Sequence, residues 1–172
     1  MVKTIAELLV ENKAIEFGDF TLASGAKSEY YIDIKSAMTN PFLLAAVAEK
    51  IVATEPFDLV AGVAVGGVPL ATAIALVAHK PYAIIRSSEK DHGKNNLIIG
   101  AVKGKNVLLV EDVTTSGGSA LYGILKLRSA GALCNRVVTV VDREQGASAM
   151  LKEHQVELIP LVKVSEILKN KE

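Results

Sequence analysis

From residue 59 onward, short runs rich in Val, Ile and Leu alternate with stretches of helical periodicity, and this alternation restricts the possible folds. Strands are predicted at residues 59–65, 82–86, 97–102, 107–110, 137–141 and 157–161, and helices at residues 69–78, 119–129 and 147–152. Strands that are apolar along their whole length are usually buried on both faces. We therefore expect an α/β fold, in which a mainly parallel twisted sheet carries helices on both faces.

The first 40 residues do not follow that alternation. Thr4 and Glu7 have the spacing of a capping box, which predicts a helix close to the start of the chain. A short hairpin is expected over residues 14–22, with its turn at Gly18-Asp19. We expect this segment, residues 1–40, to form a small N-terminal cap over one end of the sheet.

Composition narrows the class of protein further. The 172 residues suit a single domain (1–172), and with 50% hydrophobic residues the chain can bury a core of its own. The 19 Lys and Arg residues balance 19 Asp and Glu residues, which argues against a protein that binds nucleic acid through its overall charge. Cys134 is the only cysteine, so no internal disulfide can form. No apolar run is long enough to span a bilayer. We expect a cytoplasmic protein with no nucleic-acid or membrane partner.

The most informative segment follows the predicted strand at residues 107–110. It begins with an acidic pair, Glu111 and Asp112, whose carboxylates suit the hydroxyl groups of a sugar. Hydroxyl side chains, two glycines and the start of a helix come next, and the free N–H groups of a helix N-terminus bind phosphate well. Together these features predict a sugar-phosphate site, in which both carboxylates reach one ligand. The plain alternative is an ordinary strand–turn–helix connection with a good N-cap.

Three further places could carry chemistry. Gly66-Gly67 follows a predicted strand and lets backbone amides approach a second anion, although a simple tight turn explains it as well. Residues 87–96 contain no apolar side chain, so this segment, with Arg86 at its base, is predicted to be either a cationic lid or a solvated hairpin tip. Arg143 follows the strand at residues 137–141 and could bind a substrate carboxylate or pair with Glu144.

These residues also carry a resemblance to a known family. Residues 107–119 resemble the phosphoribosyl-pyrophosphate signature of type I phosphoribosyltransferases. Residues 20–33, the loop over residues 86–93 and the pair Asp142-Arg143 are similar to segments of orotate phosphoribosyltransferases, in the same order and spacing. The resemblance covers residues 16–146 and implies the type I phosphoribosyltransferase fold.

The resemblance implies transfer of phosphoribose from 5-phosphoribosyl 1-pyrophosphate to orotate, giving orotidine 5′-monophosphate and pyrophosphate in pyrimidine biosynthesis. The residues that it implies for catalysis are Lys90, His92 and Asp112. Those that it implies for the phosphoribosyl pyrophosphate are Val65, Gly66, Arg86, Lys90, His92, Glu111, Asp112, Val113, Thr114, Thr115, Ser116, Gly117, Gly118 and Ser119. Those that it implies for orotate are Thr115, Arg143, Tyr31, Ile32 and Lys27.

The resemblance also implies a cofactor and a partner. The cofactor is Mg²⁺, expected to be held mainly through the substrate and near Asp112, with no side chain assigned as a certain ligand. The partner is a second copy of the chain, in a homodimer that shares the loop at residues 86–96 across its interface.

This sequence departs from the family pattern at several cationic positions. Ser87, Ala23, Ala26 and Gly66 stand where many or some members carry a basic residue. Two alternatives therefore stay open: a phosphoribosyltransferase for another base, and a non-catalytic regulator that senses phosphoribosyl pyrophosphate. Arg143 favours a base that carries a carboxylate, and no separate DNA-binding segment supports the regulator.

Overall fold

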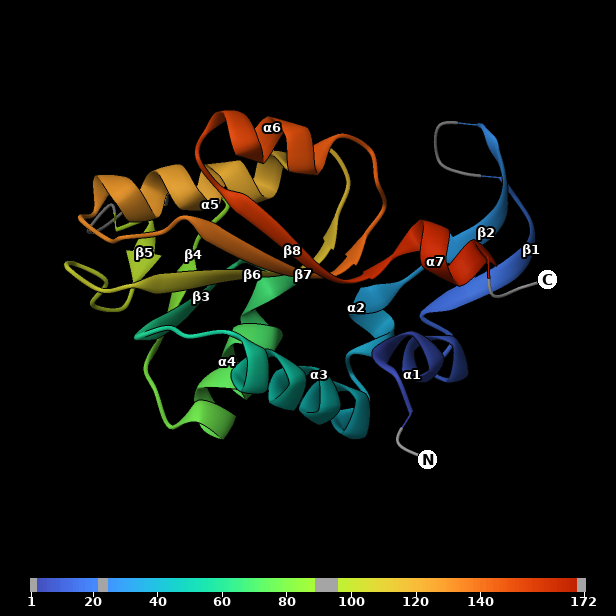
Figure 1. Ribbon diagram of the computed structural model, residues 1–172, viewed down its shortest axis with the longest axis horizontal. Coiled ribbons are helices and arrows are strands. Elements are labelled where there is room, and N and C mark those ends of the chain that lie inside the picture. Colours follow the sequence, from blue (N-terminus) through green and yellow to red (C-terminus); the bar gives the residue numbers. More distant parts are fainter. Residues whose placement is uncertain (1–2, 22–24, 89–95, 170–172) are drawn as a thin grey trace.

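The computed structural model describes residues 3–21, 25–88 and 96–169, and its centre is a six-stranded sheet (Figure 1). The strand order is β5-β4-β3-β6-β7-β8, and every neighbouring pair is parallel except β4 and β5. The strands are β3 (Leu59–Val63), β4 (Tyr82–Ile85), β5 (Ile98–Ile99), β6 (Val107–Thr114), β7 (Arg136–Asp142) and β8 (Glu157–Lys163). The predicted mainly parallel sheet is confirmed.

Helices cover both faces of this sheet, as Figure 1 shows. On one face lie α3 (Pro41–Thr54) and α4 (Gly67–Ala78), and on the other α5 (Gly118–Ser129) and α6 (Ala147–Glu153). Successive strand residues point to opposite faces. In β3, accordingly, Val60 belongs to the core beneath α3 and α4, whereas Leu59 and Ala61 belong to the core beneath α5 and α6. Burial on both faces explains why these strands are apolar along their whole length.

The N-terminal segment consists of α1 (Ile5–Glu11), β1 (Ile15–Thr21), β2 (Lys27–Ile32) and α2 (Ile34–Ala37), and its two strands form a small sheet of their own. The predicted capping box between Thr4 and Glu7 is present. The predicted turn at Gly18-Asp19 is wrong, because β1 runs through it and pairs with β2 in antiparallel fashion. The register shifts between Phe17 and Phe20, so the Gly18-Asp19 pair makes an irregularity within the strand.

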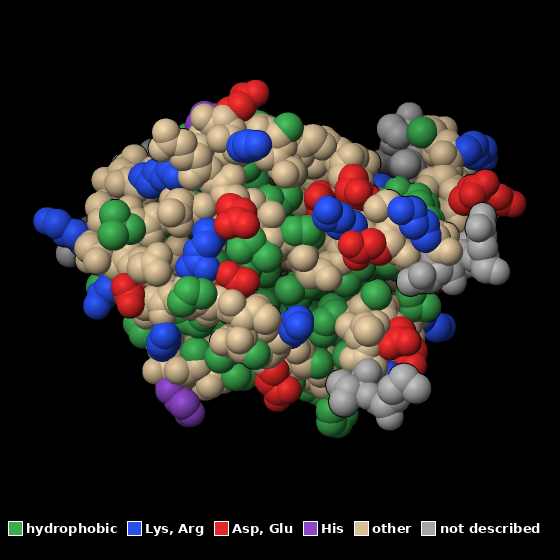
Figure 2. Space-filling model, viewed as in Figure 1, with side chains coloured by type: hydrophobic (Ala, Val, Ile, Leu, Met, Phe, Trp, Pro, Cys, Tyr) green, Lys and Arg blue, Asp and Glu red, His purple; other side chains and the backbone are tan. Residues whose placement is uncertain are grey.

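Two other predicted strands differ from the structure, and one of them is the strand at residues 107–110, which runs on through Glu111 and Asp112 to Thr114 as β6. The predicted strand at residues 97–102 is reduced to β5, which pairs with β4 and not with the following strand β6. The last element that the structure describes is α7 (Val164–Lys169). In the part of the chain that the structure describes, no helix is long and apolar enough to cross a bilayer. On the face shown in Figure 2, acidic and basic side chains are intermixed, which agrees with the balanced net charge.

A close contact between two glycines fixes the loop that follows β3. A Cβ atom added at Gly62 would overlap the backbone carbonyl of Gly67, the first residue of α4. Strand and helix therefore approach at backbone distance, which holds residues 64–66 at the carboxyl end of the sheet. In open α/β sheets this end is where ligands bind.

We predict that Gly62→Ala destabilises the protein by about 1–3 kcal/mol or more, since the new methyl group meets backbone that cannot rotate away. The control is Gly118→Ala at the first residue of α5, whose added Cβ meets only Oγ of Ser116, at 3.9 Å. This helical position is open, and alanine favours a helix over glycine by up to about 1 kcal/mol, so no loss of stability is expected. Urea denaturation measures both, and equal losses would contradict the backbone contact.

Candidate active site

The acidic pair lies near the carboxyl end of β6, and both side chains are nearly buried. Glu111 and Asp112 are each 5% exposed, and each has its own partner. Glu111 accepts a hydrogen bond from Oγ of Ser119 at 3.0 Å. Nζ of Lys35 lies 3.0 Å from Oδ2 of Asp112. Neighbouring strand residues face opposite sides, so one carboxylate is held by α5 and the other by α2.

Burial dominates the chemistry of Glu111. Removal from water raises the pKa of this carboxyl to about 7, and the charge of Asp112 acts in the same direction. The hydroxyl of Ser119 and the ammonium of Lys35 lower the pKa by smaller amounts. Near neutral pH, Glu111 is therefore poised between its charged and neutral forms, which is common for residues at functional sites.

A glycine-rich loop joins β6 to α5. Gly117 is the N-cap of α5, with φ of 87°, and no side chain caps the helix. A Cβ at Gly117 would lie 2.8 Å from Cε of Met150 in α6, so the left-handed conformation and the tight packing both require glycine. Thr115, Ser116 and Gly118 are exposed around this helix end. An uncapped N-terminus of a 12-residue helix with exposed hydroxyls beside it suits a phosphate group.

The loop after β3 brings its backbone against Asp112. A Cβ added at Gly66 would lie 2.6 Å from both carboxylate oxygens of Asp112. A side chain at position 66 therefore has no room in this arrangement. This agrees with the presence of glycine at a position where some family members carry a basic residue. Val65 beside it is 76% exposed. The expectation that the backbone amides at Gly66-Gly67 approach a bound anion stays a prediction.

The base of the cationic loop is well anchored. Arg86 follows β4, and its backbone N–H donates to the carbonyl of Leu97 at 2.8 Å. The hydroxyl of Tyr122 in α5 donates to the carbonyl of Arg86 at 2.9 Å. Lys90 and His92, which the resemblance implies for catalysis, lie outside the described residues.

Arg143 stands at the carboxyl end of β7, next to the end of β6. Its backbone N–H donates to the carbonyl of Thr114 at 2.9 Å, while its Nε is buried and has no hydrogen-bond partner among the described residues. Glu144, the alternative partner considered from the sequence, instead accepts from the backbone N–H of Ser165 at 2.8 Å. A buried donor without an acceptor costs free energy, so Arg143 is suited to an anionic ligand.

The hairpin of the N-terminal segment carries three predicted orotate contacts. Tyr31 in β2 is 47% exposed and packs against Phe20, with ring centroids 5.7 Å apart. Ile32 ends the strand and is half-buried. Nζ of Lys27 donates to Oγ1 of Thr21 at 2.8 Å, so its ammonium is engaged within the hairpin. In Figure 1, the strands β1 and β2 lie beyond one end of the six-stranded sheet.

Lys35 is the site residue that sequence reasoning missed. It lies in the four-residue helix α2 and contacts a carboxylate in β6 that is 77 positions further along the chain (112 − 35). No local pattern predicts such a contact. Within the described residues, no group of three or more His, Cys, Asp or Glu side chains could hold a metal ion without other ligands.

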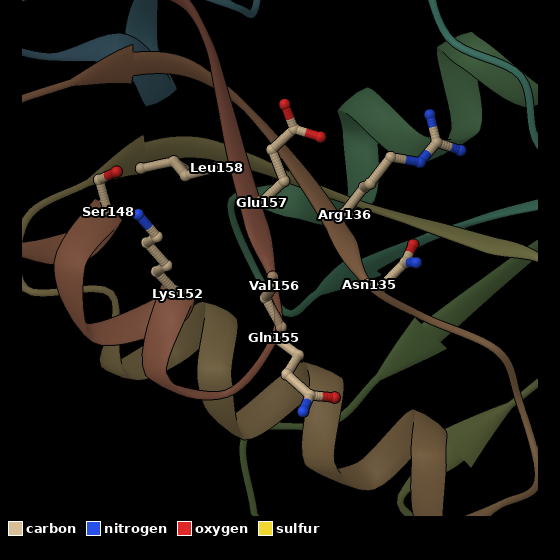
Figure 3. A pocket seen from close by; sticks show the side chains of 8 residues that line it. All are labelled: Asn135, Arg136, Ser148, Lys152, Gln155, Val156, Glu157 and Leu158. Carbon is tan, nitrogen blue, oxygen red and sulfur yellow. The ribbon is translucent and has the colours of Figure 1, made fainter.

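A separate cavity of about 500 Å³, shown in Figure 3, lies away from the acidic pair. Arg136 and Glu157, the first residues of β7 and β8, are among its lining residues, so it opens at the opposite end of these strands. The guanidinium of Arg136 is already paired with Glu55 at 2.8 Å. This cavity is therefore a poorer candidate than the carboxyl edge of the sheet.

We predict that Glu111→Gln stabilises the folded protein at pH 8 by about 2–3 kcal/mol, because each unit of pKa shift corresponds to about 1.4 kcal/mol. The pKa of this carboxyl is higher in the folded protein than in the unfolded chain, so its charged form disfavours folding. The penalty is absent below about pH 4.5, grows as the pH rises and is complete above about pH 7. Urea denaturation of both proteins at pH 4.5 and pH 8 measures the difference.

The matched control is Glu153→Gln, since Glu153 is exposed at the end of α6 and should change stability by less than about 0.5 kcal/mol. A Glu111→Gln protein that is no more stable than the original at pH 8 would contradict the cost of burying this charge.

Comparison with known proteins identifies the family. The phosphoribosyl transferase domain family matches residues 34–160. Orotate phosphoribosyltransferase of Methanocorpusculum labreanum is 59% identical over 168 residues, which cover 98% of this chain and 99% of that protein.

Solved structures agree. The crystal structure of orotate phosphoribosyltransferase from Aeropyrum pernix superposes with a TM-score of 0.84 at 29% identity and covers 98% of both chains. That of Mycobacterium tuberculosis orotate phosphoribosyltransferase in complex with 5-phospho-α-D-ribosyl 1-diphosphate gives a TM-score of 0.75 at 28% identity, over 95% of this chain and 96% of that one. Because these relatives match the chain along nearly its whole length, in sequence and in fold, the chain belongs to the orotate phosphoribosyltransferase family.

Proposed function

We propose that the protein transfers phosphoribose from 5-phosphoribosyl 1-pyrophosphate to orotate, giving orotidine 5′-monophosphate and pyrophosphate, a step of pyrimidine biosynthesis. The observation that carries the proposal is the acidic pair beside an uncapped helix N-terminus, in a chain that is 59% identical to an orotate phosphoribosyltransferase. The reaction needs a site for ribose hydroxyls and a site for a phosphate, and both lie at this edge of the sheet.

The donor is proposed to lie along this edge. Glu111 and Asp112 receive the ribose hydroxyls, and residues 113–119 hold the 5′-phosphate at the start of α5. The pyrophosphate lies by Val65 and Gly66, with Arg86 at the base of the neighbouring loop. Backbone N–H groups at a helix N-terminus favour a phosphate dianion through their alignment.

The acceptor is proposed to lie between β7 and the hairpin. The unpartnered Nε of Arg143 supports a contact with the carboxylate of orotate. Thr115 is exposed beside it, and Tyr31 and Ile32 would meet the ring. Lys27 donates one hydrogen bond to Thr21, and its two other N–H donors are available for orotate.

The chemistry requires no covalent intermediate with the protein. A ring nitrogen of orotate attacks C1 of the ribose, so that a C–N bond forms and the C–O bond to pyrophosphate breaks. The proton of the ring N–H passes to the departing pyrophosphate. Positive charge develops on the ribose and negative charge on the leaving group, so catalysis depends on positioning and on charge stabilisation. Glu111 and Asp112 lie on the side of the developing positive charge, and Arg86 lies on the side of the leaving group.

Mg²⁺ fits this site as a substrate-borne ion. Two carboxylates are too few for a cage built by the protein alone, but Mg²⁺ commonly uses one or two carboxylates together with substrate phosphates. Asp112 is the residue that would hold it once Lys35 withdraws, since its Oδ2 is paired with Lys35 and has no hydrogen-bond partner among the described residues. When bound, the ion would neutralise part of the pyrophosphate charge.

The loop at residues 86–96 is proposed to close over the pyrophosphate with Lys90 and His92, in a homodimer whose subunits share this loop, and residues 1–40 are proposed to cap the same site. The anchored base at Arg86 supports a loop whose ends stay fixed. A cytoplasmic location is proposed because the single cysteine, Cys134, is free and buried.

The test of the function is incubation with orotate, phosphoribosyl pyrophosphate and MgCl₂, followed through the loss of orotate absorbance. We expect turnover with orotate and much less with uracil or hypoxanthine, offered in competition. Faster turnover with uracil would contradict the assignment of the base. Specific DNA binding in a gel-shift assay without product formation would favour the regulator.

We predict that Arg143→Ala lowers kcat/KM for orotate by about 10–100-fold, because a hydrogen bond to a charged group contributes about 1.5–3 kcal/mol. Slow turnover of uracil, which has no carboxylate, should change by less than about threefold and serves as the matched control. Equal losses for both bases would show that Arg143 supports the fold and does not recognise the carboxylate.

We predict that Lys90→Ala lowers kcat by about 10²–10³-fold, the usual effect of removing one donor to the charge of a transition state. Steady-state kinetics with saturating substrates measure it, and a variant with near-normal kcat would make Lys90 an ordinary solvated residue. Lys103→Ala is the control, since Lys103 is exposed in the turn before β6.

A further inference from the structure

Lys35 covers the acidic pair in the ligand-free protein. Its ammonium lies 3.0 Å from Oδ2 of Asp112, and its side chain is 62% exposed whereas that of Asp112 is 6% exposed. The contact is an ion pair without hydrogen-bond geometry, because Oδ2 has no hydrogen-bond partner among the described residues. An exposed, flexible cation is thus placed over a carboxylate that the solvent hardly reaches.

The other side of the same carboxylate is closed by backbone. Gly66 lies so near that a Cβ there would be 2.6 Å from both oxygens of Asp112. The loop that carries Gly66 is held in turn by the contact between Gly62 and Gly67. Of the two covers, the Lys35 side chain is therefore the one that can move at little cost. Ribose hydroxyls can reach Asp112 only when Lys35 withdraws.

The backbone beneath Lys35 is fixed. Asp33 caps α2 by accepting from the backbone N–H of Ser36 at 3.1 Å and from its hydroxyl at 2.7 Å. Ile34, directly before Lys35, is 2% exposed and belongs to the core. Withdrawal of Lys35 thus requires rotation of one solvated side chain and leaves α2 in place.

We propose that Lys35 is a substrate-binding residue that covers Asp112 in the free protein and passes to the pyrophosphate group when phosphoribosyl pyrophosphate binds. The inference rests on the proposed function, in which the pyrophosphate lies by Gly66. Asp112 contacts both Gly66 and Lys35, so the ammonium is already beside the pyrophosphate position. In this arrangement a side chain at position 66 would collide with the Asp112 carboxylate, and Lys35 supplies a cation from a distant segment.

In this exchange of partners, neither Asp112 nor the Lys35 ammonium is left without a polar partner. In the free protein the ammonium partly neutralises two buried carboxylates, which otherwise disfavour each other's charge. In the complex, ribose hydroxyls take the place of the ammonium at Asp112, and the ammonium meets a more highly charged anion. Lysine suits this role, because its compact charge on a flexible stem can move between two partners.

The test uses isothermal titration calorimetry of the whole protein with pyrophosphate and with ribose 5-phosphate as separate ligands. Lys35→Met removes the charge and keeps the length of the side chain. We expect the Kd for pyrophosphate to rise by about 10–100-fold, the effect of losing a hydrogen bond to a charged group. The Kd for ribose 5-phosphate should not rise by more than about threefold. Lys35→Arg should restore most of the pyrophosphate affinity.

Two further variants keep the result interpretable. Lys50→Met removes the charge of an exposed lysine on α3 and should leave both affinities unchanged. Lys35→Gln retains a hydrogen-bond donor for Asp112 without the charge, and it replaces Lys35→Met if that protein does not fold. The expected loss of pyrophosphate affinity is the same.

Kinetics separate this inference from the proposed function. With active wild-type protein, Lys35→Met should raise KM for phosphoribosyl pyrophosphate by about tenfold and change KM for orotate by less than about twofold. Pyrophosphate affinity that is equal to or tighter than that of the wild type would overturn the inference. Absence of turnover in the wild type would overturn the proposed function, and the calorimetry would still report on Lys35.

Discussion

The structure depends on the burial of two adjacent carboxylates at the edge of a parallel sheet. Glu111 and Asp112 are each 5% exposed, in a strand whose preceding residues are wholly apolar. Buried charges are costly unless they are paired or hydrogen-bonded. The parts around them meet that need: a hydroxyl from α5 on Glu111, and an ammonium from α2 on Asp112. Burial of the two charges lowers the stability of the folded protein, and it places both carboxylates where they can accept hydrogen bonds from a sugar. Such a trade of stability for function is common in active sites.

The fold brings these partners together from distant parts of the chain. Parallel strands place their carboxyl ends at one edge, so the loops after β3, β6 and β7 meet there although they are far apart in sequence. The loop after β3 comes close through the contact between Gly62 and Gly67, and the end of β7 is bonded to Thr114 through the Arg143 N–H. The N-terminal segment lies outside the sheet and contributes Lys35 through α2.

Sequence patterns predicted those features that depend only on residues close together in the chain. Strands buried on both faces are apolar along their length, which made β3, β6 and β7 recognisable, and the loop over residues 113–119 is contiguous in sequence. The same reasoning failed where a distant partner decides the outcome. Gly18-Asp19 reads as a turn, but pairing with β2 carries β1 through it, and residues 97–102 read as a longer strand than the edge pairing with β4 supports. The ion pair between Lys35 and Asp112 joins residues 77 positions apart (112 − 35) and has no local signal.

The loop after β3 has no cation at position 66, and the charge near Asp112 comes from Lys35 in a distant segment. A side chain at position 66 would collide with Asp112, so a cation there would require a different position of the loop or of the carboxylate. A cation on α2 avoids that conflict, because its stem approaches through solvent and its backbone is fixed by Asp33 and Ile34. A cation that arrives by a flexible stem can also leave, whereas one that is built into the loop stays with its backbone. The ammonium beside Asp112 can therefore be exchanged for another partner. A site needs that property if its carboxylate is paired with a cation before the sugar binds and is hydrogen-bonded to the sugar afterwards.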